Sequence, residues 1–233
     1  MLSQIDLKQV LILDIETVPH YASFDEVPTP LAKLWDEKTK RQRQAEETPD
    51  EFYSRAGIWA EFGKIVCISI GMFNQNGLRV KSFADDDEKK LLIDFISLLN
   101  KQPASLALCA HNGKEFDFPY LCRRMLIHGL EIPRQLQISG KKPWEVNHVD
   151  TMELWKFGDY KNYTSLNLLA AVFNIPTPKD DIDGSDVGRV YWEDKDLQRI
   201  KIYCQKDVIT TAQLLLRFKC QPLIMEENIV LVD

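Results

Sequence analysis

Two carboxylates stand at the end of an apolar run near the start of the chain. Residues 10–13 have the pattern of a buried strand, and Asp14-Ile15-Glu16 follows them directly. Residues two apart on a strand face the same side, so we expect both carboxylates to project together. Neighbouring negative charges are costly unless a cation neutralises them, and Mg²⁺ favours oxygen ligands. The triplet therefore indicates a metal site, although two solvated acids in a loop would give the same pattern.

A third carboxylate, Asp117, follows the polar stretch His111-Asn112-Gly113-Lys114-Glu115-Phe116. A short apolar strand is expected over 105–110, and a helix over 117–128 that ends at Gly129. An Asp at the start of a helix is a common cap, and Asn-Gly is a common turn pair. The stretch by itself leaves both interpretations of Asp117 open, a metal ligand and a helix cap.

Tyr203 and a fourth carboxylate, Asp207, lie four residues apart in a long helical pattern over 192–218, so they share a face. Asp is a poor helix former away from the first turn, and Asp207 lies deep in the pattern beside its apolar stripe. A partly buried carboxylate needs a partner, which a metal would supply. A surface ion pair with Lys201 or Lys206 is the alternative.

The elements that must position these residues alternate between strand and helix patterns. Apolar runs at 65–73 and 78–83 flank an Asn-Gln-Asn-Gly turn and predict an antiparallel pair. Helices are expected from residue 85 to about 99 and over 165–173. With the two strands already described, this order favours an α/β sandwich around a mixed sheet.

Two segments interrupt that order. Residues 22–62 are rich in charge and helix formers and separate the first strand from the second. Residues 176–192 carry Pro, Gly and Asp and are typical of a loop. Neither segment shows an obvious core of its own. We therefore expect one domain over 1–233, with a charged, helical insertion at about 22–62.

The charge balance is acidic, with 29 basic and 35 acidic residues and a formal net charge of -6. The chain thus lacks the basic footprint that often marks nucleic-acid binding. The acidity does not exclude such a partner, because cations held by carboxylates supply positive charge to a phosphate.

The five cysteines are odd in number and widely spaced, with no CxxC or Cys/His cluster. We therefore expect buried free thiols in a reducing cytoplasm, and neither disulfides nor a zinc site. No run approaches the ~20 apolar residues of a membrane span, and the run at 10–13 is too short for a signal peptide. A cytoplasmic protein without a membrane partner is expected.

Taken together, Asp14-Ile15-Glu16-Thr17, Asn112-x-x-x-Phe116-Asp117 and Tyr203-x-x-x-Asp207 resemble the three motifs of the DEDDy group of 3′–5′ exonucleases. This group of the ribonuclease H-like superfamily includes the proofreading domains of family B DNA polymerases. The likeness runs from residue 10 to about 218, apart from the insertion. The sister group has a His five residues before the last Asp, where this chain has Ile202, so the tyrosine version is favoured. The resemblance implies a three-layer sandwich with a central mixed five-stranded sheet flanked by helices.

The resemblance also implies a two-metal hydrolysis of phosphodiester bonds, with two divalent cations, Mg²⁺ or Mn²⁺, as cofactors. Asp14, Glu16 and Asp207 would hold the ion that binds the attacking water. Asp14 would bridge to the second ion, which Asp117 would bind chiefly through water. Tyr203 would orient the attacking water, since a tyrosine pKa near ~10 suits an orienting group better than a general base.

Substrate contacts are implied for the same motifs. The backbone at Ile15 and Thr17 would meet the 3′ hydroxyl of the terminal nucleotide, and Asn112 belongs to the same substrate-binding set. Phe116 would stack or wedge against a terminal base, although a core position at a helix start explains it equally well. Asp150 resembles a supporting position of the family, or simply ends a strand.

The expected activity is removal of nucleoside 5′-monophosphates from the 3′ end of single-stranded DNA. An exoribonuclease is the alternative among enzymes, because the two metals read phosphate and not the sugar. A nucleic-acid-binding module that has lost catalysis is the alternative from another class, and the complete set of four carboxylates with Tyr203 argues against it. We expect no polymerase domain on this chain, so proofreading would need a polymerase or repair partner in trans. The insertion at 22–62 is the expected seat of partner or strand specificity.

Overall fold

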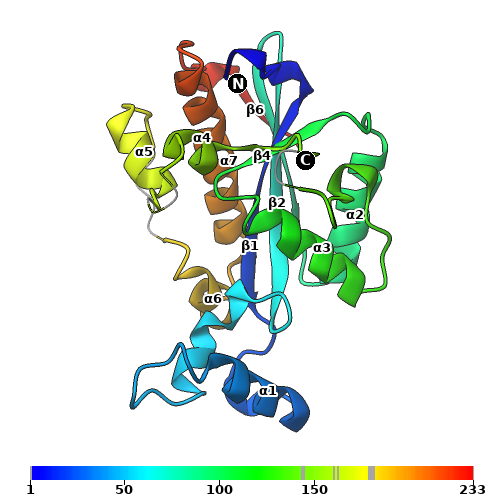
Figure 1. The fold of residues 1–233 in the computed structure, drawn as a ribbon, viewed down its shortest axis with the longest axis vertical. Helices are drawn as coiled ribbons and strands as arrows, with labels where there is room; N and C mark the ends of the chain where they lie inside the picture. The colour runs from blue at the N-terminus through cyan, green and yellow to red at the C-terminus, as the bar shows by residue number, and fades with distance from the viewer. Residues whose placement is uncertain (1, 143–144, 160, 162, 178–181, 233) are drawn as a thin grey trace.

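The centre of the molecule is a six-stranded mixed sheet with the strand order β5-β4-β1-β2-β3-β6 (Figure 1). The computed structural model describes residues 2–142, 145–159, 161, 163–177 and 182–232. β1 pairs antiparallel with β2 and parallel with β4, while β2 and β3 are antiparallel. The strands are β1 (Val10–Pro19), β2 (Gly63–Asn74), β3 (Gly77–Ala84), β4 (Ala107–Ala110), β5 (Val149–Asp150) and β6 (Ile229–Val232).

Helices cover both faces of this sheet, so the α/β three-layer sandwich is confirmed. α2 and α3 lie on one face, and α4, α5 and α7 lie on the other (Figure 1). The α-helices are α1 (Thr29–Thr39), α2 (Glu88–Asn100), α3 (Asp117–Ile127), α4 (Thr151–Lys156), α5 (Leu166–Val172), α6 (Val187–Arg189) and α7 (Leu197–Phe218). No helix in the described part of the chain is long and apolar enough to cross a membrane.

The number of strands differs from the five that the resemblance implied. β6 is the sixth strand and pairs parallel with β3, from Leu78 opposite Ile229 to Lys81 opposite Val232. A Cβ on Gly77, which has a φ of 146°, would lie 2.0 Å from the backbone oxygen of Asn228, so only glycine fits where β6 begins. β6 has four residues and none is fully buried, so it gave no alternating pattern to detect.

The long helical pattern is interrupted at its start. Residues 190–194 form one π-helical turn, Lys195 turns left-handed with a φ of 55°, and α7 begins only at Leu197. Asp196 caps α7 by accepting a hydrogen bond from the Arg199 amide. The predictions of a helix from 192 and a loop over 176–192 are therefore wrong at their shared boundary, because the cap chemistry of Asp196 was not recognised. Residues 178–181 lie outside the described residues.

The insertion at 22–62 forms a lobe beyond one end of β1 and β2 (Figure 1). It is partly helical, as expected, with α1 and a 3₁₀ helix over Glu51–Ile58. The expectation that it has no core is wrong. Trp35 is fully buried among aromatic rings whose centroids lie 5.1–5.9 Å from its own, namely those of Phe52, Tyr53, Trp59 and Phe62. These rings come from separate turns, so no periodic spacing revealed them.

Candidate active site

The alternation of β1 decides which way its carboxylates face. Leu11, Leu13 and Ile15 belong to the core beneath α2 and α3, whereas Val10 and Ile12 belong to the core beneath α7. Asp14 and Glu16 continue the second series and therefore face α7. The register of β1 against β2 shifts just after Glu16, a distortion that is common beside functional sites.

The edge of β1 opens where these carboxylates lie. β4 pairs with β1 only from Val10 to Ile12, and the chain leaves β4 at Ala110. β5 is parallel to β4 and ends at Asp150. The carboxyl ends of these parallel strands therefore meet beside Asp14, which is where α/β sheets place their ligand sites.

α7 brings the remaining groups against β1 from the other side. It approaches β2 closely, because a Cβ on Gly71 would lie only 2.8 Å from Cγ1 of Val208. Cys204 donates its thiol hydrogen to Oδ2 of Asp14 at 3.3 Å. The Tyr203 hydroxyl forms a hydrogen bond with the Asp207 side chain, and Asp207 acts electrostatically on both Asp14 and Glu16.

Asp117 completes the group from α3. The structure places Phe116 at the cap position without a side-chain cap bond, so Asp117 is the first residue of the helix and not its cap. Its carboxylate is 3% exposed and accepts hydrogen bonds from the backbone amide of Ile15 and from its own amide. Four carboxylates from three elements, β1, α3 and α7, therefore act on one another in one place.

The electrostatics of this cluster are unfavourable without a cation. Burial first, and then the neighbouring carboxylates, raise the pKa values of Asp14 and Glu16 well above their usual range. Burial raises the pKa of Asp117 to about 7. Glu16 is 7% exposed, and its carboxylate forms no hydrogen bond or ion pair with any described residue. Carboxylate oxygens that are held this close together fit divalent cations such as Mg²⁺ or Mn²⁺.

A second buried Asp holds the loop before Asp117. Asp150 accepts hydrogen bonds from the backbone amides of Asn112 and Lys114, both at 3.0 Å, and it caps α4 through the amides of Met152 and Glu153. Asn112 has a φ of 65°, a left-handed conformation that these bonds help to hold. Asp150 thus ends β5 and also positions the loop, so both sequence interpretations of it apply.

The four residues expected to bind substrate differ in burial and in their contacts. The Ile15 side chain is buried in the core, and its amide is engaged by Asp117. The Thr17 side chain forms a hydrogen bond with the Tyr120 hydroxyl. Phe116 is half-buried with its ring centroid 5.4 Å from that of Tyr120, and Asn112 is half-buried in the loop held by Asp150. Ile15 and Thr17 are neighbours of Asp14 and Glu16 along β1, and Asn112 and Phe116 lie in the segment that leads to Asp117.

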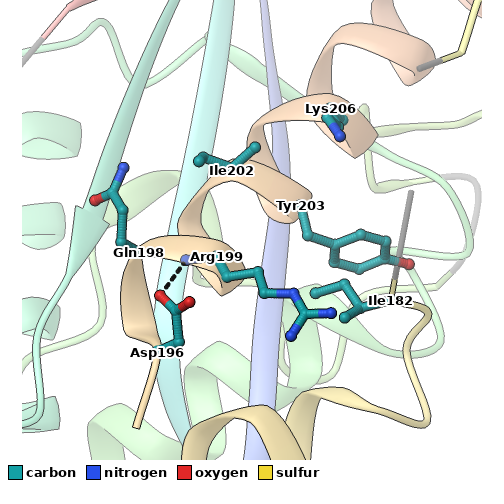
Figure 2. A pocket seen from close by; sticks show the side chains of 7 residues that line it. All are labelled: Ile182, Asp196, Gln198, Arg199, Ile202, Tyr203 and Lys206. Atoms are coloured by element: carbon teal, nitrogen blue, oxygen red, sulfur yellow. Dashed lines mark hydrogen bonds between the residues drawn. The ribbon is translucent and has the colours of Figure 1, made fainter. Parts of the chain in front are cut away.

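A pocket of about 300 Å³ adjoins the cluster and was not expected from the sequence. Figure 2 shows that the side chains of Tyr203 and Arg199 extend to the same side of α7, with Ile182 beside them. The pocket brings two basic side chains, Arg199 and Lys206, to the edge of an acidic site. Its lining is Ile182, Asp196, Gln198, Arg199, Ile202, Tyr203 and Lys206.

Comparison with known proteins points to an exonuclease. Residues 58–228 match a family model described as a predicted 3′–5′ exonuclease related to the exonuclease domain of PolB. A DNA polymerase of Pyrococcus glycovorans is 20% identical over 176 residues, which are 66% of this chain and 22% of that protein. The family B DNA polymerase of Pyrobaculum calidifontis matches with a TM-score of 0.52 and 18% identity, over 89% of this chain and 24% of the polymerase, and shows the same fold. This chain therefore spans under a quarter of the length of either relative.

The matched range contains Asp117, Tyr203 and Asp207 but begins after Asp14 and Glu16. Those two carboxylates join the site through the geometry of β1. Because the family match spans well over half of the chain and the fold agrees with it, the chain belongs to the family of predicted 3′–5′ exonucleases related to the exonuclease domain of PolB.

Proposed function

We propose that this chain is an active 3′–5′ exonuclease of the tyrosine type, which removes nucleoside 5′-monophosphates from the 3′ end of single-stranded DNA. The observation that carries the proposal is the convergence of Asp14, Glu16, Asp117 and Asp207 in one place, where burial and the neighbouring carboxylates raise the pKa values of Asp14 and Glu16. These carboxylates would hold two divalent cations. When bound, such ions activate the attacking water and stabilise charge on the phosphate and the leaving 3′ oxygen.

Tyr203 is proposed as the group that orients the attacking water. Burial and the adjacent carboxylates raise its pKa above the ordinary tyrosine value, so the hydroxyl stays neutral throughout the physiological range. A neutral hydroxyl held by Asp207 can direct a water through a hydrogen bond, but it cannot take up a proton as a base. Tyr203 also borders the pocket in which Arg199 and Lys206 lie, so the phosphates that flank the scissile bond would meet positive charge there.

Two exposed aromatic rings support a single-stranded substrate. Phe157 is 82% exposed and has a φ of 43°, which is rare for a bulky residue, and Tyr163 is 72% exposed. The segment that follows Tyr163 is tied to the loop before Asp117, because Nε2 of His111 lies 2.9 Å from the backbone oxygen of Thr164. Exposed rings are suited to stacking on unpaired bases without sequence preference, which favours a single-stranded substrate.

The proposal is tested with 5′-labelled single-stranded DNA, a mismatched primer duplex and RNA of the same sequence, each with Mg²⁺ or Mn²⁺. We expect the single-stranded DNA to shorten stepwise from its 3′ end, faster than the RNA. The shortening should stop with a chelator and in Asp14→Asn, but not in Asp94→Asn, a matched control on the exposed face of α2. If no substrate is shortened in a metal-dependent way, the chain is not an active nuclease, and preferential shortening of RNA would overturn the choice of DNA.

A further inference from the structure

A thiol lies inside the carboxylate cluster. Cys204 on α7 is fully buried, and its sulfur lies 3.3 Å from Oδ2 and 3.4 Å from the backbone oxygen of Asp14. Donor atoms of Asp14, Glu16 and Cys204 all lie within 4.8 Å of one another. Two hard oxygen donors and one soft sulfur donor therefore face the same small volume.

The carboxylate of Glu16 is available to bind a cation in this volume. Its side chain is more than nine-tenths buried and points into the group, yet none of the described residues offers it a hydrogen bond or a positive charge. A buried carboxylate in this position is stabilised once a cation binds beside it.

The types of donor atom favour one class of cation over another. Mg²⁺ takes oxygen ligands in an octahedron and leaves sulfur aside. A tetrahedral Zn²⁺ binds oxygen at about 2.1 Å and sulfur at about 2.3 Å, which puts neighbouring oxygen and sulfur ligands roughly 3.5 Å apart. The 3.3 Å between the Asp14 carboxylate oxygen and the Cys204 sulfur is close to that separation.

We propose that Asp14, Glu16 and Cys204 form a thiophilic metal site, which binds Zn²⁺ or Cd²⁺ through two carboxylate oxygens and one thiolate. The Cys204 thiol loses its proton to solvent as the metal–sulfur bond forms, and no oxidation or reduction takes place. The site shares Asp14 and Glu16 with the proposed Mg²⁺ site, so a thiophilic ion displaces Mg²⁺ and stops cleavage. Only this competition rests on the proposed nuclease function; binding of the thiophilic ion does not.

The test is a titration of the metal-free full chain with Cd²⁺, followed through the ultraviolet thiolate-to-cadmium charge-transfer band. We expect a band that saturates at one equivalent and is absent from Cys204→Ala, with Cd²⁺ affinity lowered by more than the roughly 10–100-fold that loss of a supporting partner costs. Cys109→Ala is the matched control, because Cys109 is equally buried but lies in the apolar core with Val10 and Ile12. Its band should be unchanged.

Several results would overturn the proposal. These are the absence of a saturating band, a band that survives in Cys204→Ala, or a band that is lost in Cys67→Ala but kept in Cys204→Ala. If Cys204→Ala does not fold, as judged by circular dichroism, Cys204→Ser replaces it and must lose the band. The band does not depend on DNA cleavage, so the two proposals can fail separately. If the band appears but no DNA is cleaved, only the nuclease proposal is refuted. If DNA is cleaved but no band appears, only the thiophilic site is refuted.

Discussion

The buried acids Glu88 and Glu16, on opposite sides of the sheet, have contrasting surroundings. Glu88 at the start of α2 is 5% exposed and is paired with Arg124 of α3, whose Nε lies 2.8 Å from Oε1. It also accepts hydrogen bonds from the Ile65 amide at 2.8 Å and from His128 at 2.7 Å. Burial alone would raise the pKa of Glu88, but the hydrogen bonds and charge of Arg124 outweigh it, and the pKa is lowered.

Asp14 and Glu16 are influenced in the opposite direction. The largest influences on Asp14 and Glu16 are burial and other carboxylates, and their pKa values are raised. Glu88 is thus a completed structural ion pair that joins α2, α3 and β2. For the Asp14 group we propose that cations from outside the chain supply the balance. The difference teaches that burial of an acid is not by itself a functional signal; the sign of its pKa shift and the identity of its partners separate the two cases.

Removal of the counter-ion from the Glu88 group should have the largest effect. In Arg124→Met, Glu88 is left buried without its cation, and Ala60 loses a hydrogen bond of 2.7 Å from Nη1. We expect a loss of about 3–5 kcal/mol in the free energy of unfolding, as for other broken buried pairs. Urea denaturation followed by circular dichroism measures it. A loss below about 1 kcal/mol would show that water compensates Glu88 and would remove the contrast between the two groups.

Removal of one charge from the Asp14 group should act on activity and not on stability. Asp14→Asn relieves repulsion among the carboxylates, so the metal-free variant should unfold at the same or a higher temperature than the parent chain. Cleavage of single-stranded DNA should fall by at least about 10²–10³-fold, the range for loss of one preorganised electrostatic group. A variant that is both destabilised and active would show that Asp14 is structural.

The two groups should also respond oppositely to pH. In the metal-free chain Asp117 keeps its proton to about pH 7, whereas in the unfolded chain it releases it near its ordinary value of 3.8. The folded state then binds more protons between these values, so the contribution of this group falls as pH rises from about 4 to 7. Glu88, with a lowered pKa, contributes above its ordinary value of 4.5 and loses that contribution as pH falls below it.

Saturating Mg²⁺ should reverse the first of these trends. An ion present at about 100 times its dissociation constant stabilises the folded chain by roughly 2.7 kcal/mol, and it binds more tightly as the carboxylates ionise. Thermal melting from pH 4 to pH 8, with Mg²⁺ or with chelator, measures both effects. Equal melting curves with and without Mg²⁺ at pH 7 would contradict the assignment of the carboxylates as metal ligands.

The sequence predicted much of this arrangement because the relevant spacings are local. The alternation of β1 placed Asp14 and Glu16 on one face, and the spacing of four placed Tyr203 beside Asp207. The sandwich followed from the order of the elements. The structure adds what brings distant segments together, such as the close approach of α7 that Gly71 permits.

What escaped prediction depends on contacts between distant segments. Cys204 belongs by spacing to the apolar stripe of α7, and only the packing of that helix on β1 puts its thiol against Asp14. The aromatic core of the lobe around Trp35 joins rings from separate turns. β6 is too short for its period to be detected, and its pairing depends on the space left by Gly77.

The smallest effect is expected within the Glu88 group, at His128. Its side chain is 23% exposed at the margin of the group, whereas those of Arg124 and Glu88 are 3% and 4% exposed. His128→Ala removes one hydrogen bond to a carboxylate that keeps Arg124 and the Ile65 amide, so the free energy of unfolding should fall by about 1 kcal/mol. Urea denaturation beside Arg124→Met gives the comparison, and DNA cleavage should be unchanged in both folded variants. If the two variants lose equal stability, Arg124 is not the main counter-ion of Glu88. The three partners of Glu88 would then stabilise its buried charge as one hydrogen-bond network.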